Sequence, residues 1–233
     1  MLNIKKFTVN PFQENCLLIW DETSHGVIVD PGCMRDEETA ELLHYAEASG
    51  VVVKKIMLTH GHFDHIYGVK AVAAALGATV YMNAADAELV ANGNQLLTQY
   101  YRMPDAPTDF EFTPVKEGDE IAFGNTKFSV IETPGHTFGG VCYYCKEEKL
   151  LVSGDTLFAG AIGRTDSQWG DYDKLIVAIM EKLMGLDGDV EVIPGHGPVT
   201  NIGYERTHNP FLQPFNEPDG DIDNEDELYI QGE

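Results

Sequence analysis

The sequence predicts an α/β protein of two similar halves, each a β-sheet with helices packed on its outer side. Segments that read as strands and helices follow one another in the order β-rich, helical, β-rich, helical. Of the 233 residues, 43% are hydrophobic and 23% are charged, which is typical of a soluble globular protein. A four-layer αββα sandwich satisfies this order. An ordinary α/β sheet is the alternative that periodicity alone leaves open.

The first half is expected to alternate strands with two helices. Residues 36–50 favour a helix because acids fill its first turn and Gly50 ends it. Residues 66–77 form a second, alanine-rich helix. Short apolar runs bounded by turn residues read as strands. The expected strands are residues 2–9, 14–20, 26–30, 51–58 and 78–82.

The second half follows a segment that is hard to interpret. Residues 84–116 hold two helical pieces, at 86–90 and 94–102, and a proline-spaced loop at 103–114. We expect this segment to form part of a pocket wall. Beyond it, the expected strands are residues 119–123, 126–132, 140–145, 149–153 and 190–193, with a helix at 173–185 and an irregular end.

Cys142 and Cys145 form a CxxC motif inside an expected strand. Positions three apart in a strand point to opposite faces, so we expect neither a shared metal ion nor a disulfide. These cysteines are therefore interpreted as packing residues.

Acidic residues dominate the charge. Asp and Glu number 38 against 15 Lys and Arg, for a formal net charge of -23, which argues against a nucleic-acid partner. Residues 1–212 are expected to form one domain, and residues 213–233 an acidic, flexible tail. The longest apolar run near the N-terminus, residues 16–20, is too short for a signal peptide or membrane span. We therefore expect a cytoplasmic protein without a membrane partner.

Four expected strands each end in a glycine-containing loop that carries His or Asp. The loops are THGHFDH at 59–65, TPGHT at 133–137, GDTLF at 154–158 and PGHGP at 194–198. Such loops aim side chains from a rigid scaffold. The candidate metal ligands that they carry are His60, His62, Asp64, His65, His136, Asp155 and His196.

Imidazole and carboxylate groups suit Zn²⁺, Fe²⁺ and Mn²⁺. His60 and His62 are two residues apart, so they share one face of an extended segment and can hold one ion. Asp64 and His65 follow the turn into the next helix and point elsewhere, toward a second ion. An isolated post-strand Asp such as Asp155 would usually be a cap or turn residue, and the dense histidine cluster is what favours a metal site. Isolated histidines are expected at the surface or in packing, and these are His25, His44 and His208.

In order and approximate spacing, these ligands resemble those of the metallo-β-lactamase fold superfamily. The resemblance runs from about residue 14 to residue 210 and implies the αββα sandwich, with the site at one edge between the two sheets. It implies a first metal ion held by His60, His62 and His136, a second held by Asp64, His65 and His196, and Asp155 bridging both.

Within that superfamily, residues 153–166 are similar to the glyoxalase II branch, the hydroxyacylglutathione hydrolases. PGHGPVT at 194–200 and residues 205–212 resemble its short bacterial members. Arg164 matches the basic substrate-contact position, but Asp166 and Pro198 stand where the long enzymes carry tyrosine. The basic C-terminal domain that holds glutathione is also missing, so the thiol carrier is left open.

The resemblance implies two divalent metal ions, first of all Zn²⁺, with Fe or Mn as alternatives. It implies hydrolysis of a small acyl thioester, S-lactoylglutathione or a related compound, by a hydroxide that bridges the metals. Asp64 is the candidate catalytic residue for proton transfer. A thiolate leaving group needs little help from an acid, which favours thioesters over lactams.

Other activities are weighed against this one. Persulfide dioxygenases resemble this chain through residues 60–65 and the GRTD at 163–166, and they would use one iron on His60, His136 and Asp155. The PGHGP loop favours hydrolysis instead. The remaining alternatives are a lactone or ester hydrolase, an exported β-lactamase, a nuclease of the same superfamily and a non-catalytic metal binder.

Overall fold

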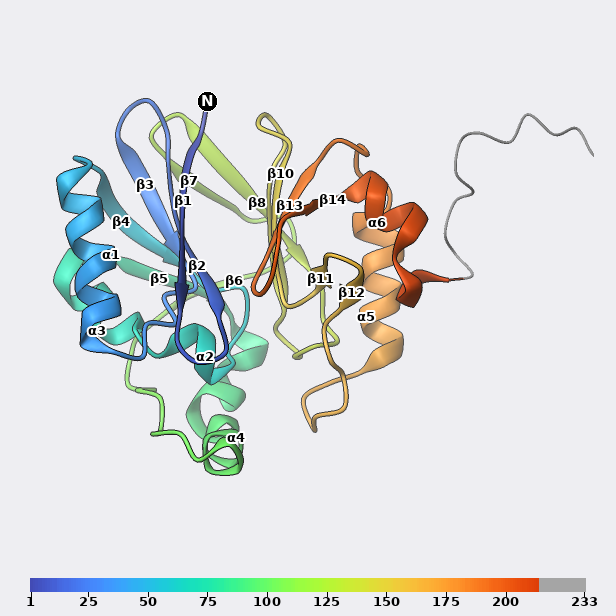
Figure 1. Ribbon diagram of the computed structural model, residues 1–233, viewed down its shortest axis with the longest axis horizontal. Coiled ribbons are helices and arrows are strands. Elements are labelled where there is room, and N and C mark those ends of the chain that lie inside the picture. The colour runs from blue at the N-terminus through green and yellow to red at the C-terminus, as the bar shows by residue number, and fades with distance from the viewer. Residues whose placement is uncertain (214–233) are drawn as a thin grey trace, which may run out of the picture.

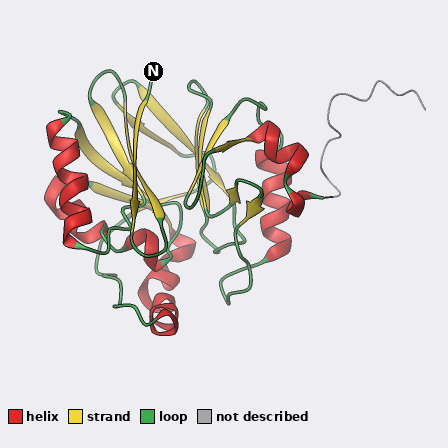
Figure 2. Cartoon of the chain, viewed as in Figure 1, coloured by secondary structure: helices red, strands yellow, loops and turns green. Residues whose placement is uncertain are grey.

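Two six-stranded β-sheets lie face to face at the centre of the protein, with helices on the outer side of each (Figure 1). The structure is a computed structural model that describes residues 1–213. The four layers run helix, sheet, sheet, helix, as the colouring by secondary structure makes plain (Figure 2). The predicted αββα arrangement is therefore confirmed.

The first sheet has the strand order β1-β2-β3-β4-β5-β6. Its first three strands are antiparallel neighbours, whereas β3, β4, β5 and β6 run parallel. Parallel neighbours need a crossover, which helices α1 and α3 supply on the outer face. The elements are β1 Asn3–Val9, β2 Glu14–Trp20, β3 His25–Val29, α1 Asp36–Ala48, β4 Val52–Met57, α2 Phe63–Ile66, α3 Val69–Leu76, β5 Thr79–Asn83 and β6 Thr113–Val115.

The second sheet has the order β14-β13-β10-β9-β8-β7. Strands β10 and β13 are parallel, and helix α5 lies in the crossover between them. A short two-stranded sheet, β11 with β12, lies beside it. The elements are β7 Glu120–Phe123, β8 Thr126–Glu132, β9 Val141–Cys145, β10 Leu150–Gly154, β11 Leu157–Phe158, β12 Ala161–Ile162, α5 Tyr172–Ala178, the π-helical turn η3 Ile179–Leu183, β13 Glu191–Pro194, β14 Thr200–Asn201, α6 Ile202–His208 and the 3₁₀ turn η4 Pro210–Leu212.

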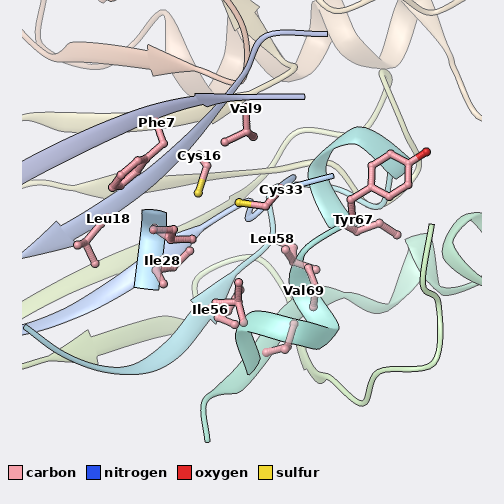
Figure 3. Close-up of a cluster of buried hydrophobic side chains, with 14 of the residues drawn as sticks. Phe7, Val9, Cys16, Leu18, Ile28, Cys33, Ile56, Leu58, Tyr67 and Val69 are labelled. Atoms are coloured by element: carbon pink, nitrogen blue, oxygen red, sulfur yellow. The ribbon is translucent and has the colours of Figure 1, made fainter. Parts of the chain in front are cut away.

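Alternation along β2 divides the core into layers. Leu17 and Ile19 face the second sheet, where they pack in one cluster with Phe128. Cys16 and Leu18 face the helices of their own half and belong to the cluster drawn in Figure 3. All of these side chains are buried, so both faces of the first sheet are covered. This packing makes the sheets a rigid support for the loops at their ends.

Several predicted elements differ from the structure. The helix expected at 66–77 is two helices, since α2 begins earlier, at Phe63, and α3 starts only at Val69. The chain end was expected to be irregular, and this prediction is wrong because the end contains helix α6. The side chain of Asn201 caps α6 by accepting a hydrogen bond from the backbone N–H of Tyr204 at 2.8 Å.

The segment that resisted interpretation contains short turns and one helix. The 3₁₀ turn η1 is Ala84–Asp86, the π-helical turn η2 is Leu89–Gly93 and α4 is Asn94–Tyr101. Helix α4 lies beside α2 at the lower end of the molecule in Figure 1. The helical pieces predicted at 86–90 and 94–102 are therefore confirmed, and the 3₁₀ and π turns are the part of the segment that the sequence did not predict.

The cysteine prediction is confirmed. Cys142 packs in the layer of α5, whereas Cys145 packs between the two sheets, so their thiols lie on opposite faces of β9. Both cysteines are free and buried. Apart from Gln213, the predicted acidic tail lies outside the described residues. Within the described part of the chain, no helix is long and apolar enough to cross a membrane.

Candidate metal centre

The four predicted loops meet at one end of the two sheets. Strands β8, β10 and β13 run in the same direction, because β9 is antiparallel to both β8 and β10 while β13 is parallel to β10. Their carboxyl ends therefore open onto one edge, opposite the loop that follows β4 of the other sheet. The loop side chains that meet there are His60, His62, Asp64, His65, His136, Asp155 and His196. His25, His44 and His208 are exposed and lie elsewhere.

Three histidines form the first group. The ligand atoms of His60, His62 and His136 all lie within 4.8 Å of one another. The closest pair is Nδ1 of His62 and Nε2 of His136, at 2.8 Å. His60 and His62 come from one extended loop and His136 from the other sheet, so the group forms only when the two halves are packed together.

Asp64, His65 and His196 form the second group, again within 4.8 Å. Nε2 of His196 lies 3.2 Å from Nε2 of His65 and 3.4 Å from Oδ2 of Asp64. Asp64 and His65 are in the first turn of α2, and the ring centroid of His65 lies 4.1 Å from that of His60. His60 and His65 also lie in one such group with Asp30, so the two sets of ligands adjoin.

Asp155 stands between the two groups. Its Oδ2 lies 3.5 Å from Nε2 of His136 and 3.6 Å from Nε2 of His196. Its Oδ1 lies 3.5 Å from Nε2 of His65. One carboxylate therefore faces both sets of nitrogen atoms, which is the position that a bridging ligand requires.

Hydrogen bonds on the far side of each ring fix which nitrogen faces the cluster. Nδ1 of His136 donates to the carbonyl of Arg164 at 2.8 Å, and Nδ1 of His196 donates to the carbonyl of Phe12 at 3.0 Å. Because a carbonyl can only accept, each Nδ1 carries the hydrogen and each Nε2 directs a lone pair at the cluster. Such outer hydrogen bonds are typical of metal-binding histidines.

His60 reaches the same state through a hydroxyl. Thr59 donates its hydroxyl hydrogen to Oδ2 of Asp30 at 2.5 Å, so its oxygen accepts from Nδ1 of His60 at 3.0 Å. Nε2 of His60 is then a buried lone pair without a hydrogen-bond partner, and Oδ1 of Asp155 is in the same condition. Buried polar atoms are rarely left unpaired, so these residues fit a pair of divalent cations.

The pKa values of His60 and His62 shift in the opposite direction from that of His65. Burial lowers the pKa of His60 and of His62 well below the usual value, and the neighbouring imidazoles lower both further. These rings are therefore neutral, which is the form that binds metal. Burial also opposes charge on His65, but Asp155, Asp64 and Asp30 outweigh it and raise the pKa of His65 to about 10. The acids around His65 thus attract a cation of any kind.

Two carboxylates that the sequence reading missed support the centre. Asp30 accepts from the backbone N–H of Thr59 at 2.7 Å and from Nδ1 of His65 at 3.0 Å. Its position directly after strand β3 is the same signal that identified Asp155, so it could have been found. Asp86 accepts from the backbone N–H of Gly61 and from the hydroxyl of Thr137, both at 2.8 Å. It lies in η1, where no sequence signal pointed to it.

Two glycines allow the chain to pass close to Asp155. A Cβ atom on Gly195 would lie 2.3 Å from Oδ1 of Asp155, and one on Gly163 would lie 1.9 Å from its carbonyl oxygen. Real Cβ atoms essentially never come so close, so both positions exclude a side chain. These close approaches hold the Asp155 loop between its neighbours.

A cavity of about 240 Å³ opens beside the cluster. Arg164, predicted to contact substrate, is among its lining residues. Its Nε and Nη2 donate to Asp166 at 2.8 and 3.2 Å, and its Nη1 donates to the hydroxyl of Tyr101 at 3.1 Å. The cavity is lined by Phe12, His62, Phe63, Asp64, Leu97, Tyr101, His136, Asp155, Arg164, Ser167 and His196.

The αββα fold and this His/Asp cluster define a metal-dependent hydrolase. A sequence profile described as the Metallo-beta-lactamase superfamily matches residues 9–196. The chain belongs to that superfamily, which implies divalent metal ions at the cluster. The resemblance predicted from the loop motifs is thereby confirmed.

Individual relatives cover nearly the whole chain. The protein is 34% identical over 215 residues to the hydroxyacylglutathione hydrolase GloC of Haemophilus influenzae, spanning 91% of this chain and 98% of that one. The crystal structure of the BLEG-1 B3 metallo-beta-lactamase superposes with a TM-score of 0.82 at 34% identity, over 91% of this chain and 100% of the other. TTHA1623, crystallised in a di-iron-bound form, superposes with a TM-score of 0.78 at 35% identity, over 89% of this chain and 100% of the other. The similarity to GloC supports the short form of the fold.

Proposed function

We propose that this protein hydrolyses a small acyl thioester with the help of two metal ions. The observation that carries the proposal is the position of Asp155, whose two oxygens face the histidines of both groups at 3.5–3.6 Å. His60, His62 and His136 would hold one ion, and Asp64, His65 and His196 the other. The similarity to GloC supports a thioester as the substrate.

Bound divalent ions supply a Lewis acid for the acyl carbonyl and a water whose pKa is brought near neutrality. The protein's own residues set the geometry. Asp30 and the carbonyls of Phe12 and Arg164 keep the ring nitrogens aimed inward. The cavity reaches ligands of both groups, so a substrate in it lies against both.

Asp64, the candidate catalytic residue, is held in its ionised form. Burial raises its pKa, but His65 and His196 outweigh burial and hold the pKa below its usual range. Its Oδ2 therefore remains an acceptor, 3.4 Å from Nε2 of His196. A thiolate leaves without a proton, because free thiols have a pKa of about 8.5, whereas an amine leaving group needs an acid. This difference favours thioesters over β-lactams.

Metal analysis and a substrate panel on one preparation test the proposal. We expect two metal ions per chain, with Zn²⁺ or Fe according to supply, and turnover of S-lactoylglutathione or simpler acyl thioesters. His196→Gln should leave one ion and abolish turnover, because it removes a ligand of the second group. His44→Gln is the matched control, because His44 is exposed on α1 and belongs to neither ligand group. This variant should keep both metal ions and its turnover.

Other results would contradict the proposal. A single iron per chain together with sulfite production from glutathione persulfide would make the protein a mononuclear oxygenase. Turnover of nitrocefin without thioester cleavage would place its activity with that of its structural relative BLEG-1. Activity on lactones or oxygen esters alone would support the proposed metal centre but contradict the proposed thioester substrate.

A further inference from the structure

Three aromatic side chains that line the cavity form a wall beside the histidines. The ring of Phe12 lies 5.2 Å from that of Phe63 and 5.2 Å from that of Tyr101, in edge-to-face contacts. Phe63 and Tyr101 are 6.0 Å apart, so the three rings contact one another. Leu97, one turn before Tyr101 on α4, also lines the cavity. The wall is thus built from three separate segments of the chain.

This wall is rigid at its base and open at its rim. Phe63 is buried in the core of the first half, with Phe12 and Leu97 packed against that core. Tyr101 is 37% exposed at the mouth. An apolar surface that lines a cavity beside a reactive centre, without being closed by other side chains, suits an apolar ligand group. The hydroxyl of a lactoyl group gains nothing from packing against Phe12, Phe63 or Leu97.

The arginine that lines the cavity is already paired. Among the described lining residues, Arg164 is the only lysine or arginine. Asp166 accepts two of its N–H groups in a fork, and Tyr101 accepts a third. A carboxylate on an incoming thiol carrier would have to compete with Asp166 for the same donors. The net charge of -23 adds a long-range repulsion against anionic carriers.

We propose that the cavity selects thioesters of apolar carboxylic acids, aliphatic or aromatic, on a thiol that carries no carboxylate. This proposal rests on the proposed thioester hydrolysis and specifies its substrate class. The apolar acyl group packs against Phe12, Phe63, Leu97 and Tyr101. Asp166 neutralises the arginine that would otherwise favour a carboxylate-bearing carrier.

A matched panel tests the acyl preference. Lactoyl and hexanoyl thioesters of N-acetylcysteamine differ only in the acyl group, and we expect kcat/KM to be about tenfold or more higher for hexanoyl. Leu97→Ala should reduce this preference by raising KM for the hexanoyl compound. Leu96→Ala is the matched control, because Leu96 is on the same helix but 62% exposed and not part of the lining. Equal kcat/KM values for the two acyl groups would overturn the proposal.

The carrier preference has its own test. The same hexanoyl group on glutathione should be the poorer substrate, and Asp166→Asn should raise the ratio of kcat/KM for the glutathione thioester to that for the N-acetylcysteamine thioester several-fold. Glutathione thioesters that are preferred by the wild-type protein would contradict the pairing argument.

Binding of the product acids separates this proposal from the proposed activity. Calorimetry on the metal-loaded protein should show hexanoate binding more tightly than lactate, with the difference reduced in Leu97→Ala and kept in Leu96→Ala. If no thioester is cleaved but this pattern appears, the activity fails and the apolar subsite remains. If thioesters are cleaved and lactate binds as well as hexanoate, the activity stands and the subsite fails.

Discussion

The carboxylate of Asp86 accepts the backbone N–H of Gly61 at 2.8 Å, between the two histidines that start the first ligand group. The same side chain accepts from the hydroxyl of Thr137 at 2.8 Å and from the N–H of Gly139 at 2.6 Å, in the loop that follows His136. One buried side chain thereby joins the loops that carry His60, His62 and His136. Its contacts with three donors set the distance between the two halves at the first metal position.

Replacing Asp86 with Asn should weaken metal binding. The amide keeps the size of the side chain but turns one acceptor into a donor that faces another donor. We expect the affinity for the first ion to fall about 10–100-fold, as for other outer partners of metal ligands. Competition with a chromophoric chelator measures this fall.

Asp21→Asn is the matched control for Asp86→Asn. Asp21 is equally buried and also joins two loops, since it accepts from the N–H of Thr23 at 2.9 Å and of Asn125 at 2.6 Å. It makes no contact with the ligand loops. Equal losses of metal affinity in the two variants would show that the effect of Asp86 is only a loss of stability.

Gly195→Ala should disrupt the position of Asp155. The added methyl would lie 2.3 Å from Oδ1 of Asp155 and 2.8 Å from Cε1 of His65. We therefore expect loss of at least one bound ion by metal analysis, with the fold kept by circular dichroism. Gly185→Ala adds the same methyl where nothing lies within 4 Å, and it should bind metal normally. Normal metal content in Gly195→Ala would contradict the close packing described for the Asp155 loop.

Removal of the metal ions should destabilise the protein. Without them, buried lone pairs such as Nε2 of His60 and Oδ1 of Asp155 lack partners. A ligand present at 1,000 times its Kd stabilises a fold by about 4 kcal/mol, so we expect chelation to lower Tm by about 10 °C. Differential scanning calorimetry measures this change. Restoration by Zn²⁺ or Fe²⁺, but not by Mg²⁺, would identify the nitrogen-rich cluster as the cause, whereas an unchanged Tm would contradict metal binding at these residues.

Low pH should remove the stability that the hydrogen bonds to ionised Asp21 contribute. Burial raises the pKa of Asp21, but hydrogen bonds from Thr23, Asn125 and Thr126 outweigh burial and hold the pKa below its usual value. Because the folded pKa is depressed, the contribution to stability is present above the unfolded pKa of about 3.9 and is lost as the pH falls below it.

Urea unfolding of Asp21→Asn as a function of pH checks this sign. We expect the free energy of unfolding to fall by about 1–3 kcal/mol at pH 7. The difference from the wild-type protein should shrink as the pH falls through the folded pKa of the carboxyl. Glu41→Gln, an exposed acid on α1, should show no such difference. A constant difference across the whole pH range would contradict the assignment to ionised Asp21.

Sequence patterns predicted the sandwich and the ligand cluster because both depend on local signals. A strand followed by a glycine-containing loop with His or Asp is visible within ten residues, and His60, Asp155 and His196 each follow that pattern. The role of Asp86 depends on a fold that brings η1 beside two distant loops. The pairing of Arg164 with Tyr101 joins residues 63 positions apart and leaves no trace in either local sequence.

Both ligand groups draw on the two halves of the chain, with His136 completing the first and His196 the second. During synthesis, the ribosome makes the whole first sheet before either of these residues, so neither of the two groups can be completed by the early half alone. Each group is completed only when the two halves dock. Ions bound by these groups would link the two sheets, so separating the halves would require the ions to be released.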